Sequence, residues 1–76
     1  PGYTATERLR ELATATARRT GRSVAAVESD WIRDIPEGRL ADPSEIGAVV
    51  AFLATPAAAY LRGQSVAVDG GRMRSI

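Results

Sequence analysis

The sequence predicts an α/β fold, in which helices cover a parallel sheet, and three observations support this class. Apolar residues recur at helical spacing in three successive segments, each preceded by a side chain that can cap a helix. The run Gln64 to Asp69 is apolar at its centre without alternation, which is typical of a parallel strand covered on both faces. A lone strand leaves its buried amides and carbonyls unpaired, so this run requires sheet partners outside the 76 residues.

The composition excludes several kinds of site. The chain has no Cys and no His, which excludes disulfides, thiolate catalysis, His-based proton relays and the usual zinc sites. All ten cationic residues are Arg, so there is no Lys for a Schiff base or a phosphate-binding loop. Nine acidic residues reduce the net charge to +1. No apolar run approaches the roughly 20 residues of a membrane-spanning helix, so we expect a cytoplasmic protein without a membrane partner.

The first helix is expected to begin at a Thr-x-x-Glu capping box, Thr4 to Glu7, in which each side chain can bond the other residue's backbone amide. Gly21 supplies the stop. The apolar face of this helix consists of Leu9, Leu12, Ala13, Thr16 and Ala17.

A second helix is expected to begin after the cap Ser23 and to end before Pro36, because a proline disfavours the helical conformation in the residue that precedes it. Its apolar stripe consists of Val24, Val27, Trp31, Ile32 and Ile35.

The third helix has the clearest start signal, which is Asp42 as N-cap, Pro43 at the first helical position and Glu45 three residues after the cap. Thr55 and Pro56 end it, and a short helical turn over residues 57–61 follows. The apolar arc extends well beyond one side, so this helix should be covered on two fronts, one of them a subunit partner. The core stripe is Ile46, Val49, Val50 and Leu53, and the arc is widened by Ala48, Ala51 and Phe52.

Motifs at both ends of the chain resemble the short-chain dehydrogenase/reductase family. Residues 38–71 read as a capped helix, an Ala-rich turn with an aromatic residue, and an apolar strand that closes on Asp-Gly-Gly, which is similar to the carboxyl end of that family. Two shorter motifs agree with the family's pattern. They are Pro1-Gly2-x-x-x-Thr6, which follows the family's sixth strand, and the turn Ile35-Pro36-x-Gly38-Arg39.

The resemblance implies that residues 1–76 are the carboxyl-terminal segment of one Rossmann-type, doubly wound parallel sheet domain. Residues 1–36 would supply the substrate-lid helices, and residues 37–76 the last helix, the last strand and the tail. The family's glycine-rich dinucleotide turn and its catalytic Ser, Tyr and Lys are expected upstream of Pro1. The segment therefore contains no catalytic residue and no metal site, and we expect it to be inactive alone.

For the parent enzyme, the resemblance implies hydride transfer between NAD or NADP and a small-molecule carbonyl or alcohol substrate, as in 3-oxoacyl-carrier-protein reductases. It places the cofactor against Pro1, Gly2, the backbone of Tyr3 and the hydroxyl of Thr6. The lid candidates are Leu9, Leu12 and Trp31, with the Tyr3 ring, although a stripe at helical spacing is also typical of an ordinary core. The family pattern further implies a homo-oligomer. Its interface residues would be Ala48, Ala51, Phe52, Val66 and Val68.

Three other interpretations stay open. Asp69, Gly70 and Gly71 can form a metal or phosphate loop, but one carboxylate is a poor metal site, and a packed turn is the simpler reading. Ala17, Gly21 and Val27 match the spacing of a helix-turn-helix. Against a DNA-binding function, and hence a nucleic-acid partner, Arg22 and Asp30 stand where that motif needs apolar residues. A free-standing helical interaction module would leave residues 64–69 without strand partners.

Overall fold

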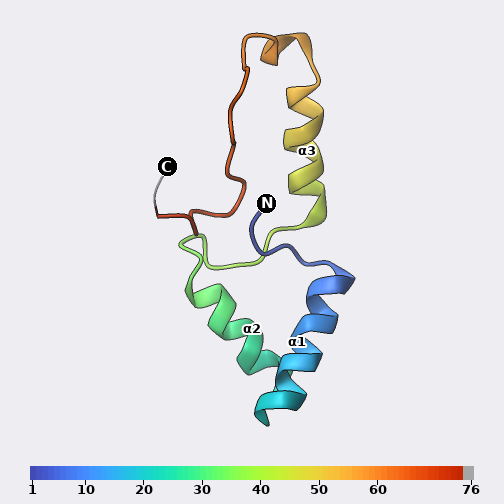
Figure 1. The fold of residues 1–76 in the computed structure, drawn as a ribbon, viewed down its shortest axis with the longest axis vertical. Helices are drawn as coiled ribbons and strands as arrows, with labels where there is room; N and C mark the ends of the chain where they lie inside the picture. The colour runs from blue at the N-terminus through green and yellow to red at the C-terminus, as the bar shows by residue number, and fades with distance from the viewer. Residues whose placement is uncertain (75–76) are drawn as a thin grey trace.

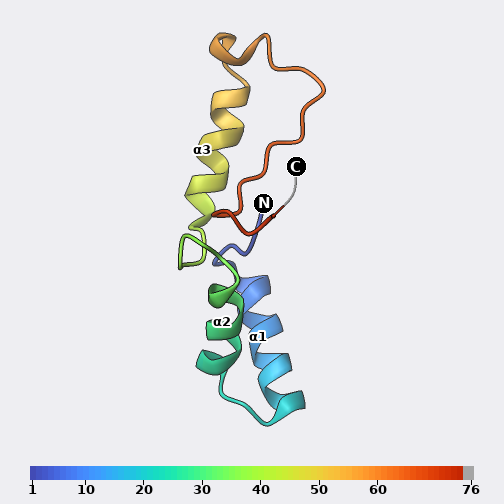
Figure 2. The ribbon, with the colours of Figure 1, turned by 90° about the vertical axis from the view of Figure 1, so that its left-hand side faces the viewer.

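A computed structural model describes residues 1–74, which form three α-helices and one 3-10 turn in the order shown in Figure 1. The elements are α1 (Glu7–Thr20), α2 (Val24–Arg33), α3 (Pro43–Leu53) and the 3-10 turn η1 (Pro56–Ala58). α1 and α2 form a helical hairpin at one end of the molecule, and α3 leads to η1 at the other end (Figures 1 and 2). The prediction of three helices is confirmed.

The helical hairpin packs through small side chains. Ala13 and Ala17 of α1 and Val27 of α2 are buried together, and Trp31 packs against them. Because two of these residues are alanines, the helix axes can approach closely at the contact. Gly21, in the left-handed conformation at φ 68°, ends α1 as predicted, and Ser23 accepts a bond from the Ala26 N–H at 3.1 Å to start α2.

The predicted start of α1 is wrong by two residues. The N-cap is Thr6, whose Oγ1 accepts from the Leu9 N–H at 3.2 Å, and not Thr4. Thr4 instead forms a parallel β-bridge with Ala41, and the Ala5 N–H donates to the Ala41 carbonyl at 2.8 Å. These contacts hold the chain extended, so the helix begins only at Glu7.

α3 has the predicted capping box. The Asp42 carboxylate accepts from the Ser44 N–H at 2.9 Å, and the Glu45 carboxylate accepts from the Asp42 N–H at 2.8 Å. The helical turn predicted over residues 57–61 is shorter and earlier, as η1, because Pro56 starts it. No α3 residue is buried among residues 1–74, and Val50, predicted for the core stripe, is 61% exposed. The cover that this helix requires is therefore not supplied by residues 1–74.

The predicted strand is not confirmed. Gln64–Asp69 runs from η1 back toward the centre of the molecule without strand pairing in the described residues (Figures 1 and 2). One bond typical of a sheet is present, from the Gly2 N–H to the Val68 carbonyl at 2.9 Å. A ladder needs a neighbouring chain along the whole segment, and residues 1–74 provide one only at this end.

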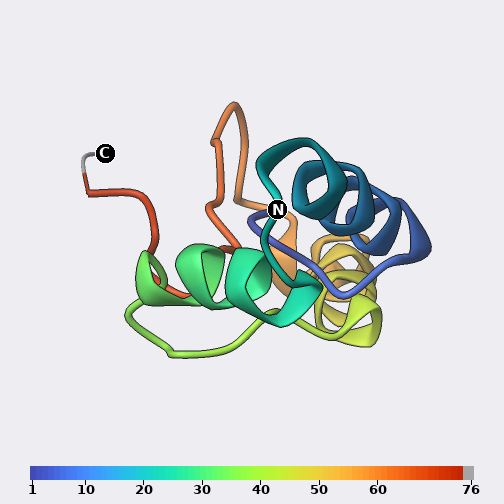
Figure 3. The same ribbon diagram turned by 90° about the horizontal axis from the view of Figure 1, so that it is seen from below.

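The molecule is elongated, with extents of 49, 25 and 18 Å. Its radius of gyration is 15.1 Å, whereas a compact domain of this length has about 11 Å. The accessible surface is 5954 Å², compared with about 4,500 Å² for a compact protein of the same mass. The tail, after Gly71, leaves on the side of α2 (Figures 1 and 3).

Candidate functional site

Three segments meet at the centre of the molecule, between the helical hairpin and α3. We call this place the central junction, and it comprises residues 1–4, 35–41 and 68–72. Backbone hydrogen bonds connect the segments in pairs. They run from the Gly2 N–H to the Val68 carbonyl (2.9 Å), from the Glu37 N–H to the Gly70 carbonyl (3.0 Å) and from the Ala41 N–H to the Tyr3 carbonyl (3.0 Å).

Glycines make the central junction possible. A Cβ at Gly2 would lie 2.7 Å from the Asp69 Cβ, closer than real Cβ atoms approach. Gly70, at φ 64°, has a left-handed backbone, and a Cβ there would lie 2.8 Å from the Cγ2 atom of Ile35. The Pro-Gly motif at one end of the sequence therefore packs directly on the Asp-Gly-Gly motif at the other.

The Asp69 carboxylate stabilises the turn that follows it by accepting hydrogen bonds from two backbone amides. One oxygen accepts from the Gly71 N–H at 3.0 Å and the other from the Met73 N–H at 2.9 Å. The bond from the Met73 N–H, followed by that from the Gly71 N–H, lowers the pKa of Asp69. Among residues 1–74, no three Asp, Glu, His or Cys side chains gather as metal ligands. The packed turn is thus the interpretation that the geometry supports.

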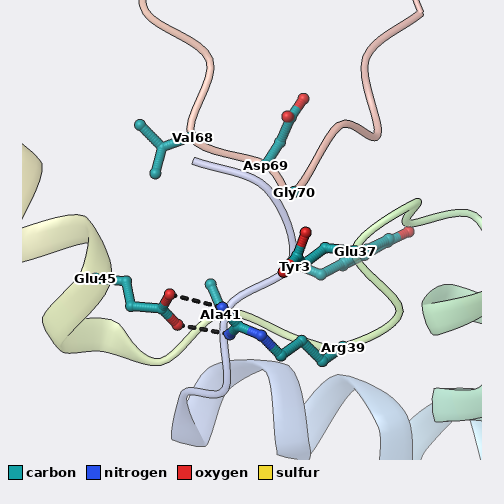
Figure 4. A pocket seen from close by; sticks show the side chains of 8 residues that line it. All are labelled: Tyr3, Glu37, Arg39, Ala41, Glu45, Val68, Asp69 and Gly70. Carbon is teal, nitrogen blue, oxygen red and sulfur yellow. Dashed lines mark hydrogen bonds and ion pairs between the residues drawn. The ribbon is translucent and has the colours of Figure 1, made fainter.

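An ion pair that the sequence analysis did not predict joins the central junction to α3. The Arg39 guanidinium donates to both oxygens of Glu45, at 2.7 and 2.8 Å (Figure 4). The bonds from Arg39, followed by the bond from the Asp42 N–H, lower the pKa of Glu45 to about 2. A sequence signal existed, since Arg39 closes a tight turn shortly before a capping-box Glu.

Three of the predicted cofactor residues lie together. Pro1, Gly2 and Thr6 border a shallow pocket of about 360 Å³, which is completed by Thr4 and by residues near the start of α3. Among the described residues the Thr6 hydroxyl donates to no acceptor, although its oxygen caps α1. The backbone N–H of Tyr3 likewise donates no hydrogen bond within residues 1–74. Both groups are therefore available as donors to a polar ligand.

The side chain of Tyr3 lines a different pocket, of about 160 Å³, beside the Arg39–Glu45 ion pair (Figure 4). Its ring stacks on Trp31, with ring centroids 5.3 Å apart and an interplanar angle of 14°. The guanidinium carbon of Arg72 lies 4.6 Å from the centroid of the same ring. Sequence reasoning did not pair these residues, because Arg72 and Tyr3 stand at opposite ends of the chain.

The predicted lid residues have different surroundings. Trp31 is half-buried against Tyr3 and the helical hairpin. Leu9 borders a small pocket with Glu28, and Leu12 is 52% exposed. The predicted interface residues also differ from one another in exposure. Ala48, Ala51 and Phe52 of α3 are exposed, as is Val66, whereas Val68 is half-buried.

The helix-turn-helix spacing corresponds to a real helical hairpin, in which Ala17 and Val27 are buried. Arg22 and Asp30, the residues that depart from the motif, form an ion pair with each other. The hydrogen bond from Arg22 lowers the pKa of Asp30. This pairing occupies an arginine that a DNA-binding motif would direct to phosphate, so the geometry does not favour a DNA-binding function.

None of the helices in residues 1–74 is long and apolar enough to cross a membrane.

Comparisons with known proteins find oxidoreductases. The family model for Enoyl-(Acyl carrier protein) reductase matches residues 5–73. Galactitol 2-dehydrogenase (L-tagatose-forming) of Cereibacter sphaeroides is 41% identical over 71 residues, which are 93% of this chain and 24% of that enzyme. NADPH-dependent reductase BacG of Bacillus subtilis (strain 168) is 34% identical over 76 residues, which are 100% of this chain and 29% of that enzyme.

A solved structure has the same arrangement. The crystal structure of a short chain dehydrogenase family protein from Francisella tularensis subsp. tularensis SCHU S4 matches with a TM-score of 0.89 at 29% identity. The match covers 95% of this chain and 30% of that protein. The chain thus spans about a quarter of the length of the curated relatives that it matches. On the family match and this shared arrangement, the chain belongs to the short-chain dehydrogenase/reductase family.

Proposed function

We propose that this chain is the carboxyl-terminal segment of an NAD(P)-dependent oxidoreductase that interconverts a ketone and a secondary alcohol. The observation that carries the proposal is the close packing of Gly2 on Asp69. It brings the segment that begins at Pro1 beside the end of Gln64–Asp69, with a sheet-like bond between them. By the family resemblance these two places are the ends of neighbouring strands, and in open α/β sheets ligands bind at the carboxyl ends of the strands.

The segment's role in this proposal is to hold the cofactor and not to perform proton transfer. NAD or NADP would supply the hydride carrier when bound. The Thr6 hydroxyl at the N-cap of α1 and the Tyr3 N–H shortly before it, both available donors, would hold its polar groups. Since the chain has no His, Cys or Lys, and lacks the family's Tyr-x-x-x-Lys pattern, the acid–base groups belong to the rest of the enzyme.

We further propose that the parent enzyme is a cytoplasmic homo-oligomer, in which the exposed apolar arc of α3 contributes to the subunit interface. The exposure of Phe52 (50%) and Val50 (61%) supports this assignment, because surfaces of this kind are usually covered in the working assembly.

A chimera tests the proposed function. In the Bacillus subtilis reductase, the matching segment, 29% of the enzyme, would be replaced by this chain. We expect the chimera to oxidise NADPH with that reductase's own substrate, and the 76-residue chain to show no turnover. A folded chimera without activity would contradict the proposal, and so would measurable turnover by the chain alone.

A further inference from the structure

One aromatic ring connects three parts of the molecule. The Tyr3 ring, in the amino-terminal segment of the central junction, stacks on Trp31 of α2 with centroids 5.3 Å apart. Arg72, in the tail, places its guanidinium 4.6 Å from the same ring centroid, in cation–π contact. Its Nη2 atom also lies 3.5 Å from the Tyr3 hydroxyl oxygen. We refer to Trp31, Tyr3 and Arg72 as the stack.

Both partners of Tyr3 are themselves held in place. Trp31 packs against the buried core of the helical hairpin. Arg72 follows the Asp69 turn, in which its own N–H donates to the Asp69 carbonyl at 3.2 Å. That turn is wedged against the 35–37 segment, since a Cβ at Gly71 would lie 3.2 Å from the Cγ atom of Pro36. Two independently fixed elements thus converge on one ring.

We propose that Trp31 and Arg72 are positioning residues for Tyr3 and, through it, for the cofactor-binding segment; this rests on the proposed function. The Tyr3 carbonyl is already fixed by the Ala41 N–H at 3.0 Å, so the stack completes the placement of the residue from its side-chain end. The direction of the free Tyr3 N–H is then set. Because α2 carries Trp31, any shift of this lid helix is transmitted to the same amide.

The stack also changes the interpretation of the lid. The Tyr3 ring packs against Trp31 and Arg72, so these contacts occupy ring surface that a substrate would need for stacking. The ring therefore positions the binding segment and does not act as a substrate platform. Removal of the Tyr3 ring should therefore raise the KM for the cofactor and leave the KM for the substrate unchanged.

Fluorescence tests the contact without any assay of activity. Trp31 is the single Trp of the chain, and Tyr3 and Tyr60 are its two Tyr residues. Tyr3→Leu should shift the Trp31 emission to the red and raise its acrylamide quenching constant about twofold. The matched control Tyr60→Leu removes a fully exposed ring and should change neither quantity. Identical emission and quenching in both variants and the unmodified chain would overturn the proposal.

Kinetics on the chimera test the positioning role. Arg72→Met should raise the KM for NADPH about two- to fivefold with kcat unchanged, as expected for loss of an exposed cation–π contact. Arg72→Lys keeps the positive charge, so its KM for NADPH should stay close to that of the unmodified chimera. Arg19→Met, the same charge change in the exposed last turn of α1, is the control. Equal KM values for Arg72→Met and Arg19→Met would overturn the inference. An inactive chimera would overturn the proposed function, and this inference with it, even where the emission shift is present.

Discussion

Gly2 shows how one missing side chain determines a junction. A Cβ at this position would lie 2.7 Å from the Asp69 Cβ and 2.8 Å from its Cα, and neither atom belongs to a flexible side-chain end. The two backbones would have to separate, with loss of the bond from the Gly2 N–H to the Val68 carbonyl.

We therefore expect Gly2→Ala to lower the free energy of unfolding of the chain by about 1–3 kcal/mol, the usual cost of overpacking. Urea denaturation followed by circular dichroism would measure it. Gly47→Ala is the matched control, since a Cβ there meets nothing within 4 Å in the helical α3. This control should stabilise the chain by about 0.5–1 kcal/mol, because Ala favours helix over Gly. The same sign of change for both substitutions would contradict the expectation.

Glu45 predicts a pH dependence of stability. Its pKa is lowered from 4.5 to about 2, first by Arg39 and then by the Asp42 N–H, so the unfolded chain binds more protons at pH 3. The stability that Glu45 contributes is complete above about pH 4.5 and is lost as the pH falls toward 2. Glu45→Gln should flatten the decline in stability between pH 5 and 3, measured by urea denaturation at each pH. Glu11→Gln, an exposed position on α1, should leave the slope unchanged, and equal slopes in the two variants would exclude this role of Glu45.

At the scale of elements, Thr4 and Thr6 make different structural contacts at the start of the chain. Thr6 caps α1, whereas the Thr4 hydroxyl donates to the Gly2 carbonyl at 3.0 Å and its backbone bridges to Ala41. Thr6→Ala should destabilise α1 by about 1 kcal/mol, the usual loss for an N-cap, and Thr4→Ala should leave the helix nearly unaffected. Hydrogen exchange of the α1 amides distinguishes the two. Faster exchange in Thr4→Ala than in Thr6→Ala would restore the capping box that the sequence suggested.

The helix boundaries illustrate which features are predictable from sequence. Ser23 and Asp42 were predicted as caps, because a cap acts on amides two or three residues away and is a local property. Thr4 was mispredicted because a distant residue, Ala41, binds the chain that would otherwise become helix. The contact of Tyr3 with Arg72 is likewise non-local, at a separation of 69 residues. Of the candidate site, the motifs were predictable, whereas their packing on each other was not.

At the scale of the whole molecule, the apolar surface of α3 dominates. The periodicity of apolar residues predicted the apolar arc of α3, but not what packs against it. Residues 1–74 leave every α3 residue at least partly exposed. The strand prediction stays unconfirmed for the same reason, since Gln64–Asp69 has no ladder partner in the described residues. Both features agree with the proposed function, in which the rest of the enzyme and a second subunit would cover these surfaces.

We expect Phe52→Ser to weaken self-association of the chimera roughly 10- to 100-fold, since burial of a Phe side chain contributes about 1.5–3 kcal/mol and each 1.4 kcal/mol is tenfold. Concentration-dependent light scattering would measure the dissociation constant. Leu12→Ser is the matched control, because Leu12 is 52% exposed and Phe52 is 50% exposed, but on different helices. An unchanged constant for Phe52→Ser, or an equal effect of Leu12→Ser, would remove α3 from the interface.

The contact between Gly2 and Asp69 also makes the intervening chain a closed loop, whose two ends are joined by the bond from the Gly2 N–H to the Val68 carbonyl. The entropy of closing such a loop grows only with the logarithm of its length, by about 0.6 kcal/mol for each doubling. Insertions or deletions in the exposed connection between α1 and α2, around Gly21, therefore add little to the cost of closing the loop. The length and sequence of the connection between α1 and α2 can therefore change among related proteins while the contact between Gly2 and Asp69 is kept.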